Sequence, residues 1–304
     1  MFHHFHKKKN QKFGQGSISI KEFEKILIFL KKNFIILNPD DWIYKLENNS
    51  LEKNNICLTF DDALLSQYRV AFKILNKHKL KAFWFIYSSI FDGKIDNFEI
   101  HRKFRSLYYK NFNDFFKNFS KYLDKDLNFK NKNEYKYFKI KMKKFYPIYS
   151  NLDIDFRYLR DHVLTNDQFN KILSNMMKEK KTNSKKLAKN LWLNNEHLRK
   201  ITKEGHTIGM HAYNHPYKLS NLNYKDQLNE LKKNLLHIKK VIKKKPISIS
   251  YPNGSFNYDT LKIIKKLGVK CGFLSNMKNY NSSINKNYLI KRLDHSILLK
   301  NFIK

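Results

Sequence analysis

The sequence predicts an α/β fold in which helices cover a parallel sheet. Residues 56–60 form an apolar run typical of a buried strand, residues 64–75 carry apolar side chains at helical spacing, and residues 82–87 form a second apolar run. A strand, a helix and another buried strand in this order make a βαβ unit, whose strands lie parallel with both faces covered. A chain of 304 residues can hold one large α/β domain or two small ones.

The elements before this unit are predicted from helix-start and turn signals. Ser19 and Glu22 have the spacing of a capping box, which begins a helix. The apolar face of that helix is formed by Phe23, Ile26, Leu27 and Leu30. Residues 38–41, with the sequence Asn-Pro-Asp-Asp, indicate a turn that caps a short helix at Trp42.

The alternation of strands and helices resumes at Ile208. It comprises a helix over about 224–242, a strand over 247–251, a turn over 252–254, a helix over 261–267, and strands over 271–274 and 288–290. These segments extend the parallel sheet that the first βαβ unit begins.

Residues from about 96 to 200 interrupt this alternation. They are rich in lysine and asparagine, and aromatic residues recur there every three or four positions from Phe104 to Tyr122. This spacing is typical of helices that pack an aromatic face inward. We predict a helical insertion within a single domain that spans 1–304; a lid, a partner-docking surface and a stabilising role are all open for it.

The charge of the chain is strongly positive. Lysine and arginine number 61 against 26 acidic residues, a formal net charge of +35. The charge is spread along the chain and lysine greatly exceeds arginine, the residue that base-specific contacts favour, so we do not expect a nucleic-acid partner. The lysines leave a peripheral contact with an anionic membrane surface open.

The lack of a recognisable targeting signal and the small number of cysteines lead us to expect a cytoplasmic protein. The N-terminal residues contain no apolar signal segment, and no window approaches 18 continuous apolar residues. Cys57 and Cys271 each lie inside an apolar segment, which is typical of small buried side chains rather than of a disulfide framework.

Chemically informative residues follow two of the predicted strands. Asp61 and Asp62 stand directly after the first buried strand, and His211 and His215 are four residues apart. Adjacent carboxylates resist joint ionisation, and a cation relieves that cost. One carboxylate with two imidazoles is a plausible catalytic zinc set, and the second carboxylate is then available as a base. The acidic pair alone is equally consistent with a helix N-cap.

Three ordered motifs resemble those of the polysaccharide deacetylases of carbohydrate esterase family four. They are Thr-Phe-Asp-Asp at 59–62, a Gly-His-x-Ile-Gly-x-His-x-x-x-His-Pro pattern at 205–216, and Pro-Asn-Gly at 252–254. The resemblance covers roughly 1–95 and 200–295. It implies a distorted (β/α)7-type barrel with the site at the carboxyl ends of the strands.

The resemblance also implies roles for individual residues. By position, Asp62, His211 and His215 would hold a divalent metal, zinc before others, and Asp61 would be the general base. His206, which precedes the ligand pair, would be structural or would support a metal ligand without binding the metal itself.

Further roles concern the acyl oxygen and the leaving amine. The backbone N–H of Asn253 would bind the acyl oxygen, Tyr251 and Arg292 would belong to the same substrate-binding site, and His295 is the candidate general acid. Asp294 could instead be the residue that faces the site.

This chain departs from the family pattern before the Pro-x-Gly turn. Many members carry there an arginine that orients the base, where this chain has Ser250; Arg292 could replace it through space. In the family a histidine often lies on the first strand, so His3 or His4 could line the pocket.

The resemblance implies a metal-dependent hydrolase that removes an N-acetyl group from an amino sugar. We expect a substrate linked to phosphate or lipid, as a precursor in cell-surface polysaccharide or lipopolysaccharide biosynthesis. The alternatives are a deformylase or another C–N hydrolase of the same fold, and a catalytically silent protein that binds glycan or nucleic acid.

Overall fold

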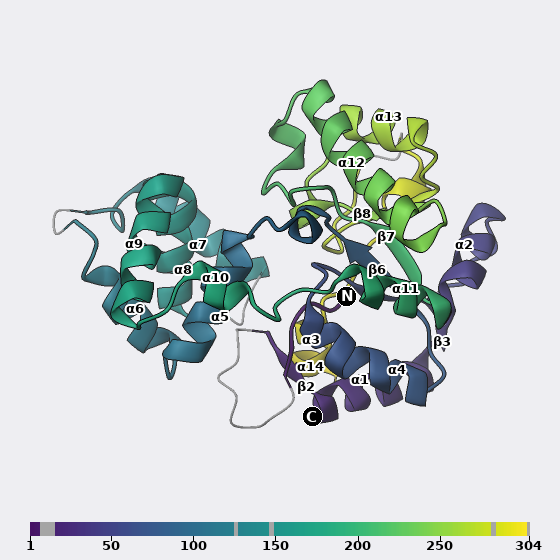
Figure 1. Ribbon diagram of the computed structural model, residues 1–304, viewed down its shortest axis with the longest axis horizontal. Coiled ribbons are helices and arrows are strands. Elements are labelled where there is room, and N and C mark those ends of the chain that lie inside the picture. Colours follow the sequence, from purple (N-terminus) through teal and green to yellow (C-terminus); the bar gives the residue numbers. More distant parts are fainter. Residues whose placement is uncertain (7–15, 125–126, 146–148, 281–283, 303–304) are drawn as a thin grey trace. The chain divides into compact units, whose positions relative to one another are not determined.

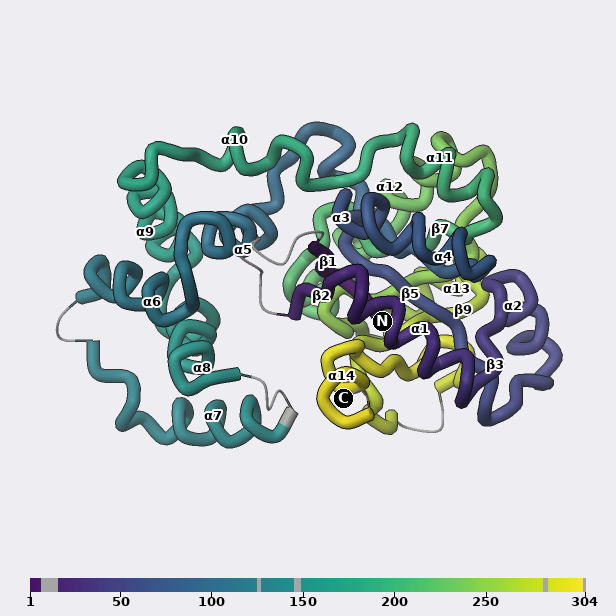
Figure 2. Tube along the Cα trace, turned by 90° about the horizontal axis from the view of Figure 1, so that it is seen from below, coloured from purple at the N-terminus to yellow at the C-terminus, as the bar shows by residue number. Residues whose placement is uncertain are grey.

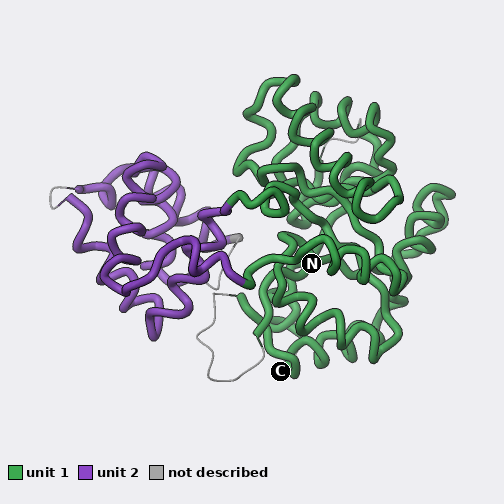
Figure 3. The backbone as a smooth tube through the Cα atoms, in the orientation of Figure 1, with its two compact units in different colours: residues 1–9, 15–94, 190–304 green, residues 10–14, 95–189 purple. Residues whose placement is uncertain are grey.

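The computed structural model describes residues 1–6, 16–124, 127–145, 149–280 and 284–302. These residues form two compact units (Figure 3). We call the unit made of the described residues of 1–94 and 190–304 the barrel unit, and the unit of 95–189 the helical unit. Each contains its own set of fully buried apolar side chains.

The barrel unit is built on a curled sheet of five parallel strands (Figure 1). In spatial order, which is also chain order, the strands are β5 (Leu58–Phe60), β6 (Ala82–Ile86), β7 (Thr207–Met210), β8 (Ser248–Ser250) and β9 (Cys271–Phe273). Parallel bridges from Phe2 to Phe60 and from Phe273 to Ile290 extend the two edges. The predicted fold class, an α/β fold with a distorted (β/α)7-type barrel, is confirmed.

Both faces of the sheet are covered. On one face the rings of Phe83 and Phe85 pack against Phe273, with centroids 5.2 and 5.1 Å apart. On the other face Trp84 stacks on Phe60 with centroids 4.5 Å apart. All these side chains are fully buried. This double burial explains why β6 is continuously apolar in sequence.

Helices connect and cover the strands. They are α1 (Ile20–Asn33), α2 (Pro39–Glu47), α3 (Leu65–Gln67) continued by a π-helical turn (Tyr68–Phe72) and α4 (Lys73–Lys77), α11 (Asn195–Lys203), α12 (Tyr224–Ile242), α13 (Tyr258–Lys266) and α14 (His295–Asn301). Helix α14 packs beside α1 (Figure 2). Two short parallel pairs flank the main sheet: β1 (Phe5–His6) with β2 (Ile18–Ser19), and β3 (Ile35–Ile36) with β4 (Asn55–Ile56).

Local sequence signals predict the helices correctly but not the last strand. The capping box at Ser19 and Glu22 is present with both of its hydrogen bonds. The strand predicted at 288–290 is wrong: residues Lys286–Tyr288 form a 3₁₀ turn capped by Asn285, and Ile290 alone bridges to β9. An asparagine cap with its hydrogen bond to the backbone favours the turn over an extended ladder.

The helical unit contains α5 (Asn97–Tyr108), α6 (Phe112–Ser120), α7 (Asn133–Phe145), α8 (Asn151–Tyr158) continued by a π-helical turn (Leu159–Val163), α9 (Asn166–Glu179) and α10 (Ser184–Ala188). Phe104, Phe115 and Phe119 are buried, so the prediction of an inward-facing aromatic stripe is confirmed. The helical unit ends at residue 189. The following residues belong to the barrel unit, in which Trp192 forms a β-bridge with Leu64.

No helix in the described ranges combines the length and the apolar composition needed to cross a bilayer.

His206 ties two neighbouring strands together. The side chain is 3% exposed, and its Nδ1 atom accepts a hydrogen bond of 3.1 Å from the backbone N–H of Ala82 at the start of β6. Burial, with a smaller effect from the charge of Lys81, lowers the pKa of His206 to about 3. The neutral ring is therefore the form that the fold requires.

We predict that His206 makes the fold less stable in mild acid. Below the ordinary histidine pKa the unfolded chain binds a proton at His206, whereas the folded chain binds that proton only near pH 3. The stability of the fold therefore falls as the pH drops. Between pH 7 and pH 5 this residue alone should cost about 2 kcal/mol of unfolding free energy. Urea unfolding at both pH values should show that loss in the wild type and a smaller one in His206→Asn, whose amide oxygen can still accept from Ala82. Equal losses in the two proteins would contradict the prediction.

Candidate active site

Asp61 and Asp62 lie at the carboxyl end of β5. The backbone there is fixed by hydrogen bonds from Phe2 N–H to the Thr59 carbonyl and from Asp61 N–H to the Phe2 carbonyl. Asp62 has a φ of +76°, a left-handed conformation uncommon for a residue with a Cβ. The chain therefore turns sharply after the strand, and the two carboxylates make different contacts.

His211 follows β7 directly, and its ring orientation is fixed by the neighbouring strand. Its Nδ1 atom lies 2.7 Å from the carbonyl oxygen of Ser250. A carbonyl can only accept, so Nδ1 carries the proton and Nε2 keeps its lone pair. That Nε2 atom lies 3.3 Å from Oδ1 of Asp62. Such backbone support is typical of a histidine that ligates metal.

His215 completes a cluster of three metal-ligating side chains. Its Nε2 atom lies 3.5 Å from Asp62 Oδ1, and the ligand atoms of Asp62, His211 and His215 all lie within 4.8 Å of one another. Two ligands each about 2.0–2.1 Å from a tetrahedral zinc ion are about 3.4 Å apart, so the two distances from Asp62 Oδ1 to the histidine nitrogens fit such an ion. A carboxylate with two imidazoles also suits zinc chemically and leaves a coordination position for water.

Asp61 is held by a buried ion pair instead. Arg292 donates from Nη1 to Oδ1 at 2.8 Å and from Nη2 to Oδ2 at 2.7 Å. Ser250 Oγ donates to Oδ2 at 3.0 Å and itself accepts from Arg292 Nη2 at 2.7 Å. Burial alone would raise the pKa of Asp61, but the charge and hydrogen bonds of Arg292 outweigh burial and hold the pKa below its ordinary value. Asp61 is therefore ionised at neutral pH.

Arg292 thus contacts Asp61, as expected if it replaces the arginine that many family members carry at the position of Ser250. Its Nε atom donates to the Leu274 carbonyl at 2.5 Å, and Nη1 also donates to Thr59 Oγ1 at 3.2 Å. Arg292 as a residue is 5% exposed, and its guanidinium connects the carboxyl ends of β5, β8 and β9.

The loop between the two histidines is supported by polar residues of α12 that sequence reasoning missed. Glu230 accepts from the backbone N–H groups of Tyr213 and Asn214, at 3.1 and 2.8 Å. Asn234 accepts from His211 N–H at 2.9 Å and donates to the Ile86 carbonyl at 2.8 Å. The sequence signal that could have revealed them is a set of three polar residues, at 227, 230 and 234, beside the apolar stripe of the helix. All three are buried in the structure.

The Pro252–Gly254 turn follows β8 as expected. Asn253 has a φ of +52° and Gly254 a φ of +69°. A Cβ on Gly254 would lie 2.3 Å from Ser275 Oγ, so only glycine fits. The turn is closed by the N–H groups of Gly254 and Ser255, and the N–H of Asn253 takes no part in these two bonds.

Two of the predicted site residues point elsewhere. Tyr251 is fully buried, and its hydroxyl donates to the Tyr288 carbonyl at 3.1 Å. His295 is 3% exposed, stacks on Phe2, and its Nε2 atom lies 2.8 Å from the Gly16 carbonyl. Both side chains thus lie buried among backbone acceptors, and the roles expected for them in substrate binding and proton donation stay predictions.

His3 lies beside Asp61 and is a second candidate for the general acid. Its Nε2 atom is 4.0 Å from Asp61 Oδ2, and its Nδ1 atom is 3.9 Å from Asp294 Oδ2. Its side chain is 26% exposed, so it reaches solvent while lying between two carboxylates. The first extended segment of the chain thus places a histidine beside Asp61, with Asp294 on the other side of its ring.

Comparisons with known proteins agree with this geometry. A family model for polysaccharide deacetylase matches residues 168–272, a range that holds His211, His215 and Asn253 but not the aspartate pair. The deacetylase PplD of Streptococcus pyogenes is similar in structure, with a TM-score of 0.58 and 17% identity over 98% of this chain and 94% of that one. The resemblance to the polysaccharide deacetylases is confirmed.

Two further solved structures share the fold over nearly the whole chain. A de-N-acetylase from Aggregatibacter actinomycetemcomitans has a TM-score of 0.56 and 14% identity over 96% of this chain and 92% of that one. IcaB from Ammonifex degensii has a TM-score of 0.53 and 14% identity over 96% and 88%. A comparison with curated proteins found no match.

We predict that Arg292→Met is strongly destabilising, because it leaves the carboxylate of Asp61 buried without its partner. Breaking such a pair typically costs about 3–5 kcal/mol. Urea unfolding should show a loss of that size, whereas Arg199→Met, at an exposed site on α11, should change stability by less than about 0.5 kcal/mol. Adding Asp61→Asn to Arg292→Met should restore part of the loss. A cost below 1 kcal/mol would show that water already screens the pair.

Proposed function

We propose that the barrel unit is a metal-dependent carbohydrate deacetylase, which hydrolyses the N-acetyl group of an amino sugar. The observation that carries this proposal is the convergence of one carboxylate and two imidazole nitrogens beside a second carboxylate that Arg292 keeps ionised. Two carboxylates in adjacent positions thus have separate partners, which separate roles require.

The roles follow from the contacts. Zinc held by Asp62, His211 and His215 would lower the pKa of a bound water and polarise the acyl oxygen. Asp61 accepts the proton of the attacking water, and Arg292 with Ser250 keeps its carboxylate oriented during that transfer. The N–H of Asn253 donates to the acyl oxygen as negative charge develops on it.

The leaving amine needs a proton, and we assign its delivery to His3 instead of His295. His3 is partly exposed and lies between Asp61 and Asp294, which would orient the ring. His295 has no such access, because Nε2 is bonded to a backbone carbonyl within the core.

The substrate class is a further part of the proposal. The positive charge of the chain favours a phosphate- or lipid-linked amino sugar over a neutral polymer, in keeping with a precursor of surface polysaccharide or lipopolysaccharide. A cytoplasmic location and contact with an anionic membrane stay predictions. The silent-binding alternative drew on Ser250 in place of arginine, and the position of Arg292 removes that support. Release of formate instead of acetate would favour the deformylase alternative.

We predict one equivalent of zinc per chain, lost in His211→Ala. Elemental mass spectrometry of tag-free protein should show this loss, whereas Asp61→Asn should keep the metal, because Asp61 is bonded to Arg292. Assays of acetate release from N-acetylglucosamine 1-phosphate, with neutral N-acetylglucosamine oligomers as the reference substrate, should show kcat reduced by about 10²–10⁴-fold in Asp61→Asn, the usual contribution of a general base. Zinc binding that survives in His211→Ala, or full activity in Asp61→Asn, would reject these assignments.

We predict that His3→Gln lowers kcat by about 10²-fold or more with little change in KM or zinc content, because it removes a proton donor and no ligand. A leaving group that needs no proton should restore most of the rate. His295→Asn, as the comparison, should lower thermal stability and leave kcat of the folded enzyme within a few-fold of the wild type. Loss of kcat in His295→Asn but not in His3→Gln would return the role to His295.

A further inference from the structure

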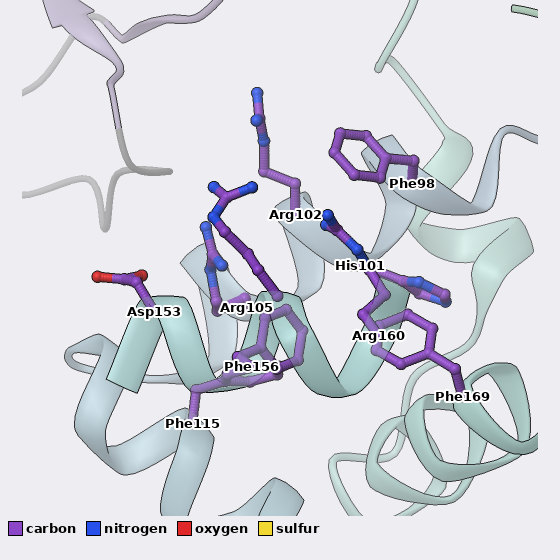
Figure 4. Close-up of a pocket in the computed structure, with 10 residues that line it drawn as sticks. Phe98, His101, Arg102, Arg105, Phe115, Asp153, Phe156, Arg160 and Phe169 are labelled. Atoms are coloured by element: carbon purple, nitrogen blue, oxygen red, sulfur yellow. The ribbon is translucent and has the colours of Figure 1, made fainter. Parts of the chain in front are cut away.

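A cavity lined by arginine and aromatic residues lies within the helical unit. Its empty volume, open solvent at the mouth included, is about 470 Å³. Its lining includes Arg102 and Arg105 from α5, and Arg157 and Arg160 from α8 and the π-helical turn that continues it. The side chains of Arg102 and Arg105 extend to the same side of α5 (Figure 4).

The gathering of arginine here is not a by-product of the basic composition. The whole chain has only seven arginines among its 61 basic residues, and four of the seven line this cavity. Lysine overuse explains a diffuse charge, but it does not explain why the scarce guanidinium groups are concentrated at one place. Guanidinium is the group that recognises phosphate and carboxylate through paired N–H donors.

Two of the four guanidiniums have a carboxylate partner. Arg102 Nη1 lies 3.7 Å from Glu99 Oε1, and Arg160 donates to both oxygens of Asp161, at 2.6 and 2.8 Å. These pairs leave the charge of the other two arginines to be accounted for.

Arg105 and Arg157 have no carboxylate within 4.0 Å among the described residues. Asp153 also lines the cavity, but its Oδ2 atom accepts from the N–H and the hydroxyl of Ser150, and its carboxylate is turned away from Arg102 and Arg105 (Figure 4). Burial, followed by repulsion from Arg102 and Arg157, lowers the pKa of Arg105 to about 10. Two positive charges therefore line one cavity, and Asp153 offsets them in part without forming an ion pair with either.

Aromatic rings hold these guanidiniums in place. Arg105 lies over Phe112 and Phe115, with its Cζ atom 5.1 and 5.9 Å from the ring centroids, and Arg157 lies 4.0 Å over Tyr149. Cation–π contact engages the face of a guanidinium and leaves its N–H edge able to donate. The two arginines are thus positioned by contacts that do not use their hydrogen-bonding capacity.

We propose that this cavity binds a phosphate group. Two under-compensated guanidiniums match the double charge of a phosphate monoester better than the single charge of a carboxylate or a sulfate ester. The phosphate could be the free ion or could be carried by a sugar; the phosphoryl chemistry is common to both. The inference rests on the helical unit alone and is independent of the proposed hydrolase function.

Calorimetric titration of the full-length protein tests the proposal, with inorganic phosphate and N-acetylglucosamine 1-phosphate as probes and unphosphorylated N-acetylglucosamine as the reference. We expect both phosphates to bind and the sugar alone not to. Arg105→Met and Arg157→Met should each weaken binding by at least tenfold, whereas Lys171→Met, which removes one exposed charge from α9, should change it less than twofold. Tighter binding of the sugar phosphate would assign the site to a sugar ester, and equal binding to the free ion.

The same titrations in His211→Ala separate this site from the metal cluster. Binding that persists there and is lost in Arg105→Met supports the proposal, even if the protein has no deacetylase activity. Binding that is lost in His211→Ala, or that survives in both arginine variants, overturns it. So does sedimentation with phosphatidic acid vesicles in the absence of binding to either soluble phosphate.

Thermal unfolding tests whether the variants are folded. Because Arg105 is held among like charges, Arg105→Met should melt at the same or a higher temperature than the wild type without phosphate, and phosphate should no longer raise that temperature. A structural role would give the opposite result, a marked fall in melting temperature. Arg105→Lys keeps the charge but loses the paired donors, so it should fold and bind more weakly.

Discussion

The buried pair between Arg292 and Asp61 is the interaction on which the rest of the site depends. The two side chains come from opposite ends of the barrel sequence, and both are almost completely removed from water. Neither charge is tolerable there alone, so each requires the other. By fixing Asp61, the pair leaves Asp62 as the carboxylate directed to the histidines, and the adjacent carboxylates acquire different chemistry.

The parallel sheet explains why these residues meet at all. Parallel strands in spatial sequence place their carboxyl ends at one edge, so residues that follow β5, β7 and β8 become neighbours. Polar groups on α12 then fix the loop after β7: Glu230 holds the backbone of Tyr213 and Asn214, and Asn234 holds that of His211. The sheet provides proximity and the helix provides orientation, which metal ligation needs together.

The helical unit uses charge in a different way. In the barrel unit the buried arginine is neutralised by a carboxylate through paired hydrogen bonds. In the helical unit Arg105 and Arg157 are stacked on aromatic rings, and the nearby carboxylates are engaged elsewhere. A neutralised pair stabilises and orients a neighbour, whereas an under-compensated cluster attracts an anion. The same residue type thus has two physical roles in one chain.

The sequence by itself predicted most of the elements and the candidate metal ligands, because strand runs, helix caps, the Asp61-Asp62 pair and the His-x-x-x-His spacing of His211 and His215 are each local patterns. Only the tertiary structure decided which residues complete the site. Arg292 and His3 reach Asp61 through space from more than 50 residues away, and no local pattern records such a contact. His295 and Tyr251 were assigned to the site through the family resemblance, but in the structure both side chains are bonded to backbone carbonyls. Long-range packing, which decides where a side chain points, is the part that a one-dimensional pattern leaves out.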